Sequence, residues 1–375
     1  MSGMSAPSIP NLLTLRGGSR GGSGIRGRTR GRGRGQGGAP STPDSAATHD
    51  ATIQGTDTDA AVSRMSAVDL GYLQDRYAYH FVQRTGMGMG MGMGMDDPVR
   101  RLPIINRGTY TRTAAIDSLI GNFLSVTRGQ ERQIISLGAG TDTRVFRLFN
   151  EGGQKSIIYH EIDFPIMSNK KSRLIKTTPA LRAVIPKLEY VAETETWRGE
   201  ELLGQENRYW CHGLDLRDLS KSDLTGLRTD LPTLLLSECC LCYLEAAEAS
   251  KVIGYFTERI PDLAVVLYEP IHPDDPFGKQ MVSNLAARRI RMPTLEVYTD
   301  TSRQKSRLRE AGFSAANSLT IEAIWENWVP TQEKERVDGL EGLDEVEEWN
   351  LLASHYCVSW GWRGSSLEGW GGGPT

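Results

Sequence analysis

The sequence is poor in the residues that would hold a metal ion or a disulfide framework. It has five cysteines, which do not form the paired C-x-x-C arrangement of a zinc site, and no histidine pair accompanies them at zinc-ligand spacing. Three of them fall in Cys239-Cys240-Leu241-Cys242, which is typical of small buried side chains in a reducing compartment. We therefore expect no metal site.

Long hydrophobic runs are also missing. No segment approaches the roughly 20 apolar residues that a membrane-spanning helix needs, and Met1–Pro10 lacks the charged-then-apolar order of a secretory signal. Hydrophobic residues make up 39% of the chain, which is enough for a buried core. The sequence therefore predicts a soluble cytoplasmic protein that does not engage a membrane.

Acidic residues are absent from the first 38 positions, which hold seven arginines in repeats such as Arg30-Gly31-Arg32-Gly33-Arg34. Residues 1–60 have almost nothing to bury, so we expect a disordered tail. An extended polycation attracts phosphates without reading sequence. The tail therefore suggests weak association with RNA, although it has no interleaved aromatic residues for base stacking. A solvated tail without a partner is the alternative.

Further boundaries follow from composition. Residues 61–125 contain a helical apolar spacing near their end, and we expect an N-terminal helical lid segment there. That segment is interrupted at 86–95 by alternating glycine and methionine, which argues against a strand and indicates a flexible insertion. We expect the main domain at 126–363 and a flexible C-terminal tail at 364–375.

Strand-like apolar runs and helical patterns alternate along the main domain. Runs that read as strands occupy 133–137, 157–162, 209–216, 233–237, 263–268 and 355–362, and helical patterns occupy 143–149, 165–175, 246–259, 278–290, 301–311 and 341–354. Such alternation predicts an α/β fold, with a mostly parallel sheet covered by helices on both faces. Periodicity alone does not separate the doubly wound folds from one another.

The strongest local signal is the glycine-containing stretch that follows the first strand. Ile135-Ser136-Leu137-Gly138-Ala139-Gly140 places bare backbone at the carboxyl edge of the sheet, where cofactors bind. Glycine at positions 138 and 140 lets a ligand approach the backbone closely. The third glycine of a dinucleotide fingerprint is missing. This favours a nucleoside cofactor without a pyrophosphate.

Acidic residues end three of the expected strands. Asp163 closes the second strand, 23 residues after Gly140, where a carboxylate can accept hydrogen bonds from ribose hydroxyls. Its alternative role is to cap the following helix. Asp215 and Glu238 end the third and fourth strands, and we expect them to contact the adenine and amino-acid parts of the same cofactor.

At this point the sequence resembles the leucine carboxyl methyltransferase family over about residues 53–363. The resemblance rests on Asn106-Arg107-Gly108-Thr109-Tyr110-Thr111-Arg112-Thr113, Leu137-Gly138-Ala139-Gly140-Thr141-Asp142-Thr143, Glu161-Ile162-Asp163-Phe164-Pro165, Asp215-Leu216-Arg217-Asp218-Leu219, Leu236-Ser237-Glu238-Cys239, Tyr243-Leu244 and His355-Tyr356-Cys357. It implies a class I methyltransferase, Rossmann-like, with a seven-stranded sheet. It also implies methylation of the C-terminal leucine carboxylate of the protein phosphatase 2A catalytic subunit, with S-adenosyl-L-methionine as the methyl donor.

The same resemblance assigns roles to individual residues. The implied cofactor contacts are Arg64, Arg112, Gly138, Asp163, Asp215, Leu216 and Glu238. Beyond these assignments, we expect Arg112 to hold both the substrate carboxylate and the cofactor's own carboxylate, because a guanidinium can bind carboxylates bidentately. Tyr243 is our candidate for a second donor, with a core aromatic as its alternative role.

The implied chemistry needs no general base, because an α-carboxylate with a pKa of about 3.3–3.7 is already ionised at neutral pH. Catalysis would then consist mainly of positioning. Two alternatives stay open, a small-molecule O-methyltransferase and an RNA-binding scaffold that acts through the arginine-rich tail. A related transferase for a hypermodified tRNA base would carry repeats of ~50 residues, and the sequence contains none.

Overall fold

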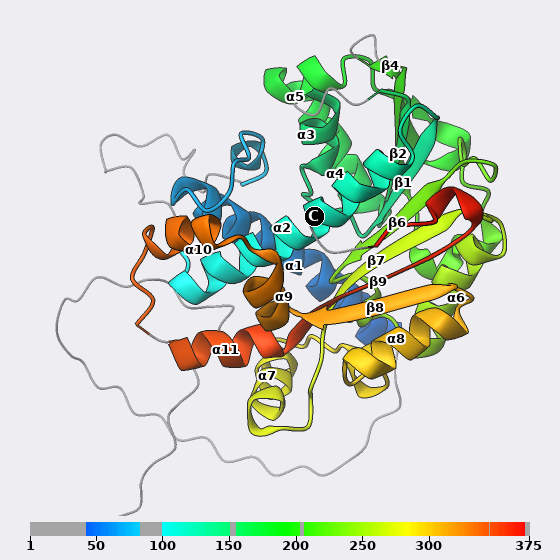
Figure 1. Cartoon of the computed structure of the whole chain (residues 1–375). Coiled ribbons are helices and arrows are strands. Elements are labelled where there is room, and N and C mark those ends of the chain that lie inside the picture. The colour runs from blue at the N-terminus through cyan, green and yellow to red at the C-terminus, as the bar shows by residue number, and fades with distance from the viewer. Residues whose placement is uncertain (1–42, 83–99, 151–154, 203–205, 345, 372–375) are drawn as a thin grey trace, which may run out of the picture.

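The computed structural model describes residues 43–82, 100–150, 155–202, 206–344 and 346–371. They form one nine-stranded sheet with helices packed on both of its faces (Figure 1). The arginine-rich repeats and the Gly-Met insertion lie outside these ranges. Among the helices of the described residues, none combines the length and the hydropathy needed to span a bilayer.

The strands alternate with helices, as the sequence predicts. Their bounds are Arg132–Leu137 (β1), Ile157–Asp163 (β2), Glu189–Val191 (β3), Thr196–Leu202 (β4), Asn207–Gly213 (β5), Thr233–Glu238 (β6), Leu263–Pro270 (β7), Ala315–Thr320 (β8) and Tyr356–Arg363 (β9). Their order in the sheet is β3-β4-β5-β2-β1-β6-β7-β9-β8. The five strands from β5 to β7 are parallel, and β9 and β8 continue the sheet in antiparallel pairing.

The α/β class and the seven-stranded arrangement with its terminal hairpin-like pair are confirmed by the segment from β5 to β8. The count of seven strands is exceeded by two, because β3 and β4 extend the edge beyond β5. Strand β3 is short and largely exposed. Strand β4 has the sequence TWRGEEL, which polar residues interrupt. Neither strand contains the continuous apolar run that marks the buried parallel strands.

Several helices begin at a proline, which suits the first turn because its missing N–H would have no helical partner there. The helices are Pro43–Asp69 (α1), Pro103–Val126 (α2), Arg144–Asn150 (α3), Pro165–Thr177 (α4), Pro179–Val184 (α5), Ala246–Thr257 (α6), Pro276–Ala287 (α7), Thr301–Glu310 (α8), Ile321–Trp328 (α9), Thr331–Asp338 (α10) and Val346–Ser354 (α11).

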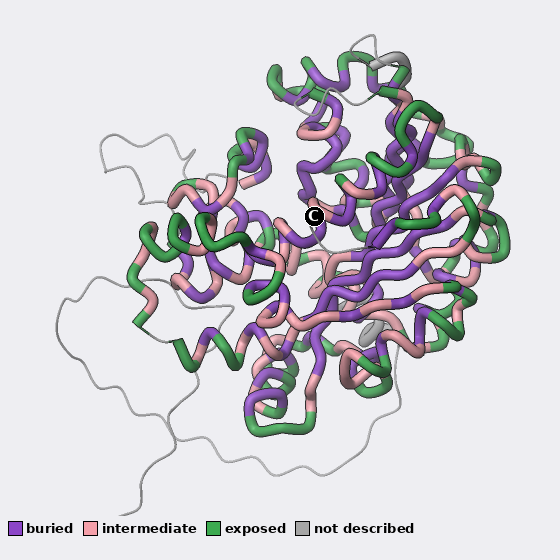
Figure 2. Tube along the Cα trace, viewed as in Figure 1, coloured by how far each residue is buried: buried purple, intermediate pink, exposed green. Residues whose placement is uncertain are grey.

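Two hydrophobic clusters hold the helices against the sheet. Alternate residues of a strand face opposite sides, so Ile134 belongs to the cluster with α2, α3, α9 and α11, and its neighbour Ile135 to the cluster with α6 and α8. Figure 2 shows the central strands as the continuous buried part of the molecule. The carboxyl ends of the parallel strands are thereby fixed at one edge.

The expected disordered tail through residue 60 is wrong for residues 43–60, because α1 begins at Pro43. Polar contacts hold the N-terminal part of this helix, whereas Ala61 and Ala67 further along it are buried. Asp50 accepts a hydrogen bond of 2.6 Å from Arg217, and Asp59 pairs with Arg101 and Arg288. Such partners lie far away in the sequence, so no local pattern reveals them.

The expected flexible C-terminal tail is wrong for residues 364–371. The Trp370 side chain is 1% exposed, and its indole N–H donates a 3.0 Å hydrogen bond to the Leu119 carbonyl of α2. The Gly371 carbonyl accepts a bond of 2.8 Å from the indole of Trp360. One buried aromatic residue and two indole hydrogen bonds therefore fix this segment against the core.

Candidate active site

A cavity of about 1220 Å³ opens at the edge where the parallel strands end. Residues from the ends of β1, β2, β5, β6 and β7 line it, and α1, α2 and α7 close it from outside the sheet. Because neighbouring strands end side by side, the sheet order also orders the cavity lining. The ends of β5, β2 and β1 lie on one side of the end of β6, and the end of β7 and the start of β9 lie on the other.

The glycine loop after β1 is shaped by protein neighbours as well as by any ligand. Gly138 has φ +59°, and a Cβ there would lie 2.6 Å from the Cys240 sulfur. Gly140 has φ +42°, and a Cβ there would lie 2.4 Å from Oδ1 of Asp57. A side chain at either position would collide with the protein itself. Both glycines are therefore required for the loop to close against β6 and α1.

Asp163 ends β2 beside this loop. Its Oδ2 accepts a 2.7 Å hydrogen bond from the Gly140 N–H, and its Oδ1 accepts one of 2.7 Å from the Phe164 N–H. Burial raises the pKa of Asp163 to about 6, although these two N–H groups act in the opposite direction. Each carboxylate oxygen keeps a further lone pair, so Asp163 can still accept hydrogen bonds from a ligand.

Asp215 follows β5 and caps the 3₁₀ turn Leu216–Lys221 (η3), where it accepts the Arg217 N–H at 2.9 Å. The Arg217 guanidinium also binds both of its oxygens and reaches Asp50 of α1. Leu216 is buried and lines the cavity beside it. The β5 end is thus linked to α1 through one arginine.

Glu238 ends β6 and lies between two arginines. Its Oε2 accepts a hydrogen bond of 2.6 Å from Arg144, and its Oε1 lies 2.8 Å from Nε of Arg112. The second contact is an ion pair whose angle falls outside hydrogen-bond geometry. Burial alone would raise the pKa of Glu238, but the two guanidinium groups lower it below its ordinary value. Glu238 is therefore held as an anion.

Arg112 comes from α2 and sits over the Tyr268 ring, with 5.2 Å between its Cζ atom and the ring centroid. Burial opposes its charge, but the neighbouring Glu238 carboxylate raises the pKa of Arg112 above its ordinary value. Within the described part of the chain, no residue accepts a hydrogen bond from its two terminal nitrogens. Those nitrogens are available to a ligand carboxylate.

Arg144 organises this part of the site, and sequence reasoning missed it. Besides Glu238, it binds Asp142 at 2.9 Å and Asp117 at 2.9 Å. Its side chain is buried at the start of α3. The only local signal is an arginine directly after the glycine loop, in a segment that otherwise reads as an ordinary apolar helix. Its three acidic partners could not be found without the fold.

Arg64 reaches the glycine loop from α1. Its Nη1 donates a 3.0 Å hydrogen bond to the Thr141 carbonyl, and its Nη2 lies 3.8 Å from the Asp142 carboxylate. This places a cation from the N-terminal helix against the loop.

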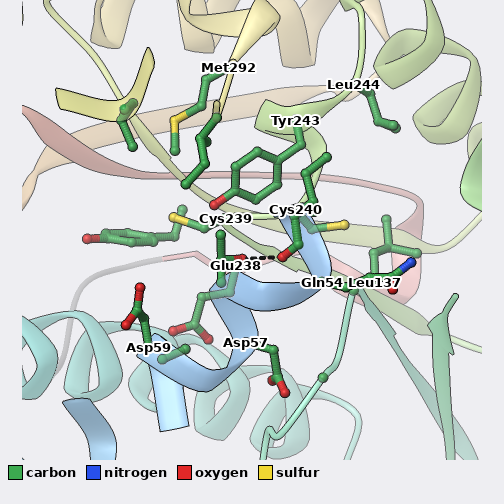
Figure 3. A pocket seen from close by; sticks show the side chains of 18 of the residues that line it. Gln54, Asp57, Asp59, Leu137, Glu238, Cys239, Cys240, Tyr243, Leu244 and Met292 are labelled. Carbon is green, nitrogen blue, oxygen red and sulfur yellow. Dashed lines mark hydrogen bonds between the residues drawn. The ribbon is translucent and has the colours of Figure 1, made fainter. Parts of the chain in front are cut away.

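The other side of Glu238 is lined by aromatic and aliphatic side chains. Tyr268 at the end of β7 stacks on Tyr356 at the start of β9, with ring centroids 5.5 Å apart. Tyr243, in the 3₁₀ turn after β6, faces the same space, and Figure 3 shows it opposite Asp57 with Glu238 between them. Apolar residues complete this side, namely Phe277, Met281, Leu285, Ile290, Met292 and Leu352.

The cavity therefore brings together all eight residues predicted from the sequence. Their roles stay predictions. All five cysteines are free thiols. Among the described residues, no group of three or more histidine, cysteine or acidic side chains has a geometry that could hold a metal ion.

Comparison with known proteins decides the family. The family model for leucine carboxyl methyltransferase matches residues 52–257. Leucine carboxyl methyltransferase 1 of Emericella nidulans is 47% identical over 400 aligned positions, which cover 98% of each chain. The chain belongs to the leucine carboxyl methyltransferase family. The resemblance in the sequence motifs is thereby confirmed, and the protein is a carboxyl methyltransferase.

This chain is also similar to proteins with other names. The tRNA wybutosine-synthesizing protein 4 of Rattus norvegicus is 33% identical over 327 positions, which cover 84% of this chain and 45% of that protein. An O-methyltransferase family protein from Burkholderia thailandensis aligns in structure over 70% of this chain and 60% of its own, with a TM-score of 0.37 and 15% identity. A score this low has no bearing on ligand or reaction.

Membership of the leucine carboxyl methyltransferase family gives the two sides of the cavity a chemical meaning. A methyl transfer to a carboxylate needs a donor and an acceptor held on either side of the transferred group. Glu238 and Arg112 stand between the polar side, formed by the glycine loop and Asp163, and the aromatic side, formed by Tyr243 and Tyr268. The cavity therefore has a polar side and an aromatic side, with Glu238 between them.

Proposed function

We propose that this enzyme uses S-adenosyl-L-methionine to methylate the C-terminal leucine α-carboxylate of the protein phosphatase 2A catalytic subunit. The observation that carries the proposal is the position of Arg112. No described residue accepts a hydrogen bond from its two terminal nitrogens, which favours a carboxylate as the ligand. These nitrogens lie where a polar nucleoside side and an apolar acceptor side of one cavity meet.

The polar side fits S-adenosylmethionine in its donor set. Asp163 retains lone pairs for two ribose hydroxyls. Gly138 and Gly140 are among the residues that line the cavity, and Leu216 offers an apolar surface for a base. Arg64 supplies a cation beside the loop. When bound there, S-adenosylmethionine would provide an electrophilic methyl group on sulfur.

The acceptor side fits a terminal leucine. Its aliphatic side chain can be buried against Met281, Leu285 and Met292, which is favourable by about 25 cal/mol for each Å² removed from water. The adjoining carboxylate would then reach Arg112. Burial raises the pKa of Tyr243 and Tyr268 well above the ordinary tyrosine value. These hydroxyls therefore stay protonated and can donate to an anion.

The chain's own residues would act by positioning and charge stabilisation. Arg112 would hold the carboxylate with two N–H groups, and Glu238 fixes the direction of the guanidinium through its 2.8 Å contact with Nε. No residue has to remove a proton, because the acceptor is already an anion. Closure of the cavity by α1 would exclude water, which strengthens these charge interactions.

The proposal is tested with synthetic peptides that carry the phosphatase C-terminal sequence and differ only in their last group. The free acid should accept labelled methyl from S-adenosylmethionine in a form released by mild base. A peptide ending in leucine amide should not react, because it has no carboxylate oxygen. A peptide ending in aspartate should react poorly, because it would bury a second charge in the apolar side. Equal labelling of the acid and the amide would contradict the proposal.

Association of the arginine-rich tail with RNA stays a separate proposal, as does a cytoplasmic location. The test for RNA is removal of residues 1–42, which leaves α1 and its contacts with Arg217 and the glycine loop intact. We expect the truncated chain to lose salt-sensitive RNA binding and to keep its turnover on the phosphatase peptide. Adding tRNA as an acceptor in the same assay tests the activity named for the rat relative. We expect no label on tRNA.

A further inference from the structure

Asp57 is a cavity carboxylate without a cationic partner in the described chain. Its neighbours in the lining are paired: Arg144 binds Asp142 and Glu238, and Asp59 binds Arg101 and Arg288. Asp57 instead accepts a single hydrogen bond, of 2.7 Å, from the Thr141 N–H to its Oδ1. Its Oδ2 is buried and has no hydrogen-bond partner.

Asp57 lies directly against the part of the glycine loop that faces the polar side. Its Oδ1 occupies the space of a Gly140 side chain, and Asp163 accepts the N–H of the same glycine from β2. Two carboxylates therefore flank Gly140, and neither is paired with an arginine or a lysine. In Figure 3, Asp57 and Tyr243 lie on opposite sides of Glu238.

A buried carboxylate oxygen without a donor is costly, by more than a neutral group in the same position. A ligand that brings an N–H cation would remove that cost. S-adenosylmethionine carries one such group, its α-ammonium. Its sulfonium is also positive but has no hydrogen to donate. Its ribose hydroxyls are neutral, and Asp163 is the strand-end carboxylate placed to receive them.

We propose that Oδ2 of Asp57 accepts a hydrogen bond from the α-ammonium group of the cofactor. The inference rests on the proposed use of S-adenosylmethionine and adds a binding residue from the N-terminal helix. One carboxylate would thereby join three parts of the enzyme. Its Oδ1 holds the glycine loop, its Oδ2 holds the ligand, and its backbone belongs to α1. Binding of the cofactor would then stabilise the closed position of this helix.

Asp57→Asn tests the inference, because an amide keeps an oxygen for the Thr141 N–H and removes the charge. Calorimetry would compare S-adenosylhomocysteine with its analogue in which hydrogen replaces the α-amino group. We expect the wild-type enzyme to bind S-adenosylhomocysteine about tenfold or more tightly than the analogue. In the variant, most of this preference should be lost, while binding of the analogue itself stays nearly unchanged.

Asp59→Asn is the matched control, since it lies two positions further along the same helix and its carboxylate is already paired with arginines. It should keep the preference, and thermal unfolding should show that both variants fold. If Asp57→Asn weakens both ligands equally, Asp57 acts only through the loop and the inference is overturned. S-adenosylmethionine is measured as a third ligand, and the inference is also overturned if Asp57→Asn weakens only its binding, because the contact would then be with the sulfonium. Failure of the wild-type enzyme to bind any of these ligands would overturn the proposed cofactor as well.

Discussion

Replacing Arg112 with lysine separates a two-point carboxylate grip from a simple positive charge. The lysine would keep the charge, and its ammonium could still approach Glu238, which lies 2.8 Å from the present Nε. It could not pair with Glu238 and also offer two parallel N–H groups to an acceptor. We therefore expect Arg112→Lys to damage turnover almost as much as Arg112→Ala.

The magnitude follows from the surroundings of the pair. The Arg112 and Glu238 side chains are only 17% and 16% exposed, so solvent screens their charges little. Truncating one partner of a buried charge pair costs roughly 2–5 kcal/mol. If this loss falls on the transition state, kcat/KM should drop about 30-fold to several thousandfold.

The assay is steady-state methylation of a phosphatase C-terminal peptide, with calorimetry of cofactor binding in parallel. Arg107→Lys is a matched control on the same helix, because Arg107 stacks on Trp325 and binds Asp338 without lining the cavity. It should alter stability rather than turnover. Near-normal turnover of folded Arg112→Lys would refute the carboxylate grip and leave only the fold and family assignments.

Three further predictions concern pH and stability. Burial lowers the pKa of His160 well below its ordinary value and that of His212 to about 4. The unfolded chain therefore binds more protons, and the free energy of unfolding should fall between about pH 6.5 and 4, by up to ~1.4 kcal/mol per unit for each histidine. The raised pKa of Asp163 partly opposes this loss. Because His212→Asn removes one of the two histidines, the free energy of unfolding of this variant, measured by denaturation, should depend less steeply on pH than that of the wild type. Affinity for S-adenosylhomocysteine should decline as pH falls through about 6, where Asp163 protonates, and calorimetry of Asp163→Asn should show no such inflection. Trp370→Ala should lower the free energy of unfolding by about 3–5 kcal/mol, measured by urea titration, because it empties a buried site and leaves the Leu119 carbonyl without its indole donor.

The sequence predicted best where a local pattern and a general rule of the fold coincide. The parallel strands are rich in apolar residues, and the residues at their carboxyl ends, among them Asp163 and Glu238, must meet at one edge. Their assembly in the cavity could therefore be predicted without distances. The antiparallel β3 and β4 could not, because β3 is only three residues long and largely exposed and polar residues interrupt the sequence of β4.

The sequence did not predict the segments whose structure depends on contacts with residues far away in the chain. Residues 43–60 have the composition of a solvated tail, and contacts with Arg101, Arg217, Arg288 and the glycine loop make them part of the enzyme. Trp370 likewise lies in a glycine-rich end whose fixation depends on α2. The same reasoning explains why Asp57 was missed, since its importance comes from a loop 84 residues away.

The central claim is that the enzyme esterifies one carboxylate, that of a terminal leucine in the phosphatase catalytic subunit. The most direct measurement is tandem mass spectrometry of that subunit after incubation with the enzyme and S-adenosylmethionine. We predict a single added methyl group on the C-terminal leucine, removed by mild base and absent when Arg112→Lys replaces the wild-type enzyme. A methyl group on any internal side chain, or an unmodified C-terminus after prolonged incubation, would contradict the claim.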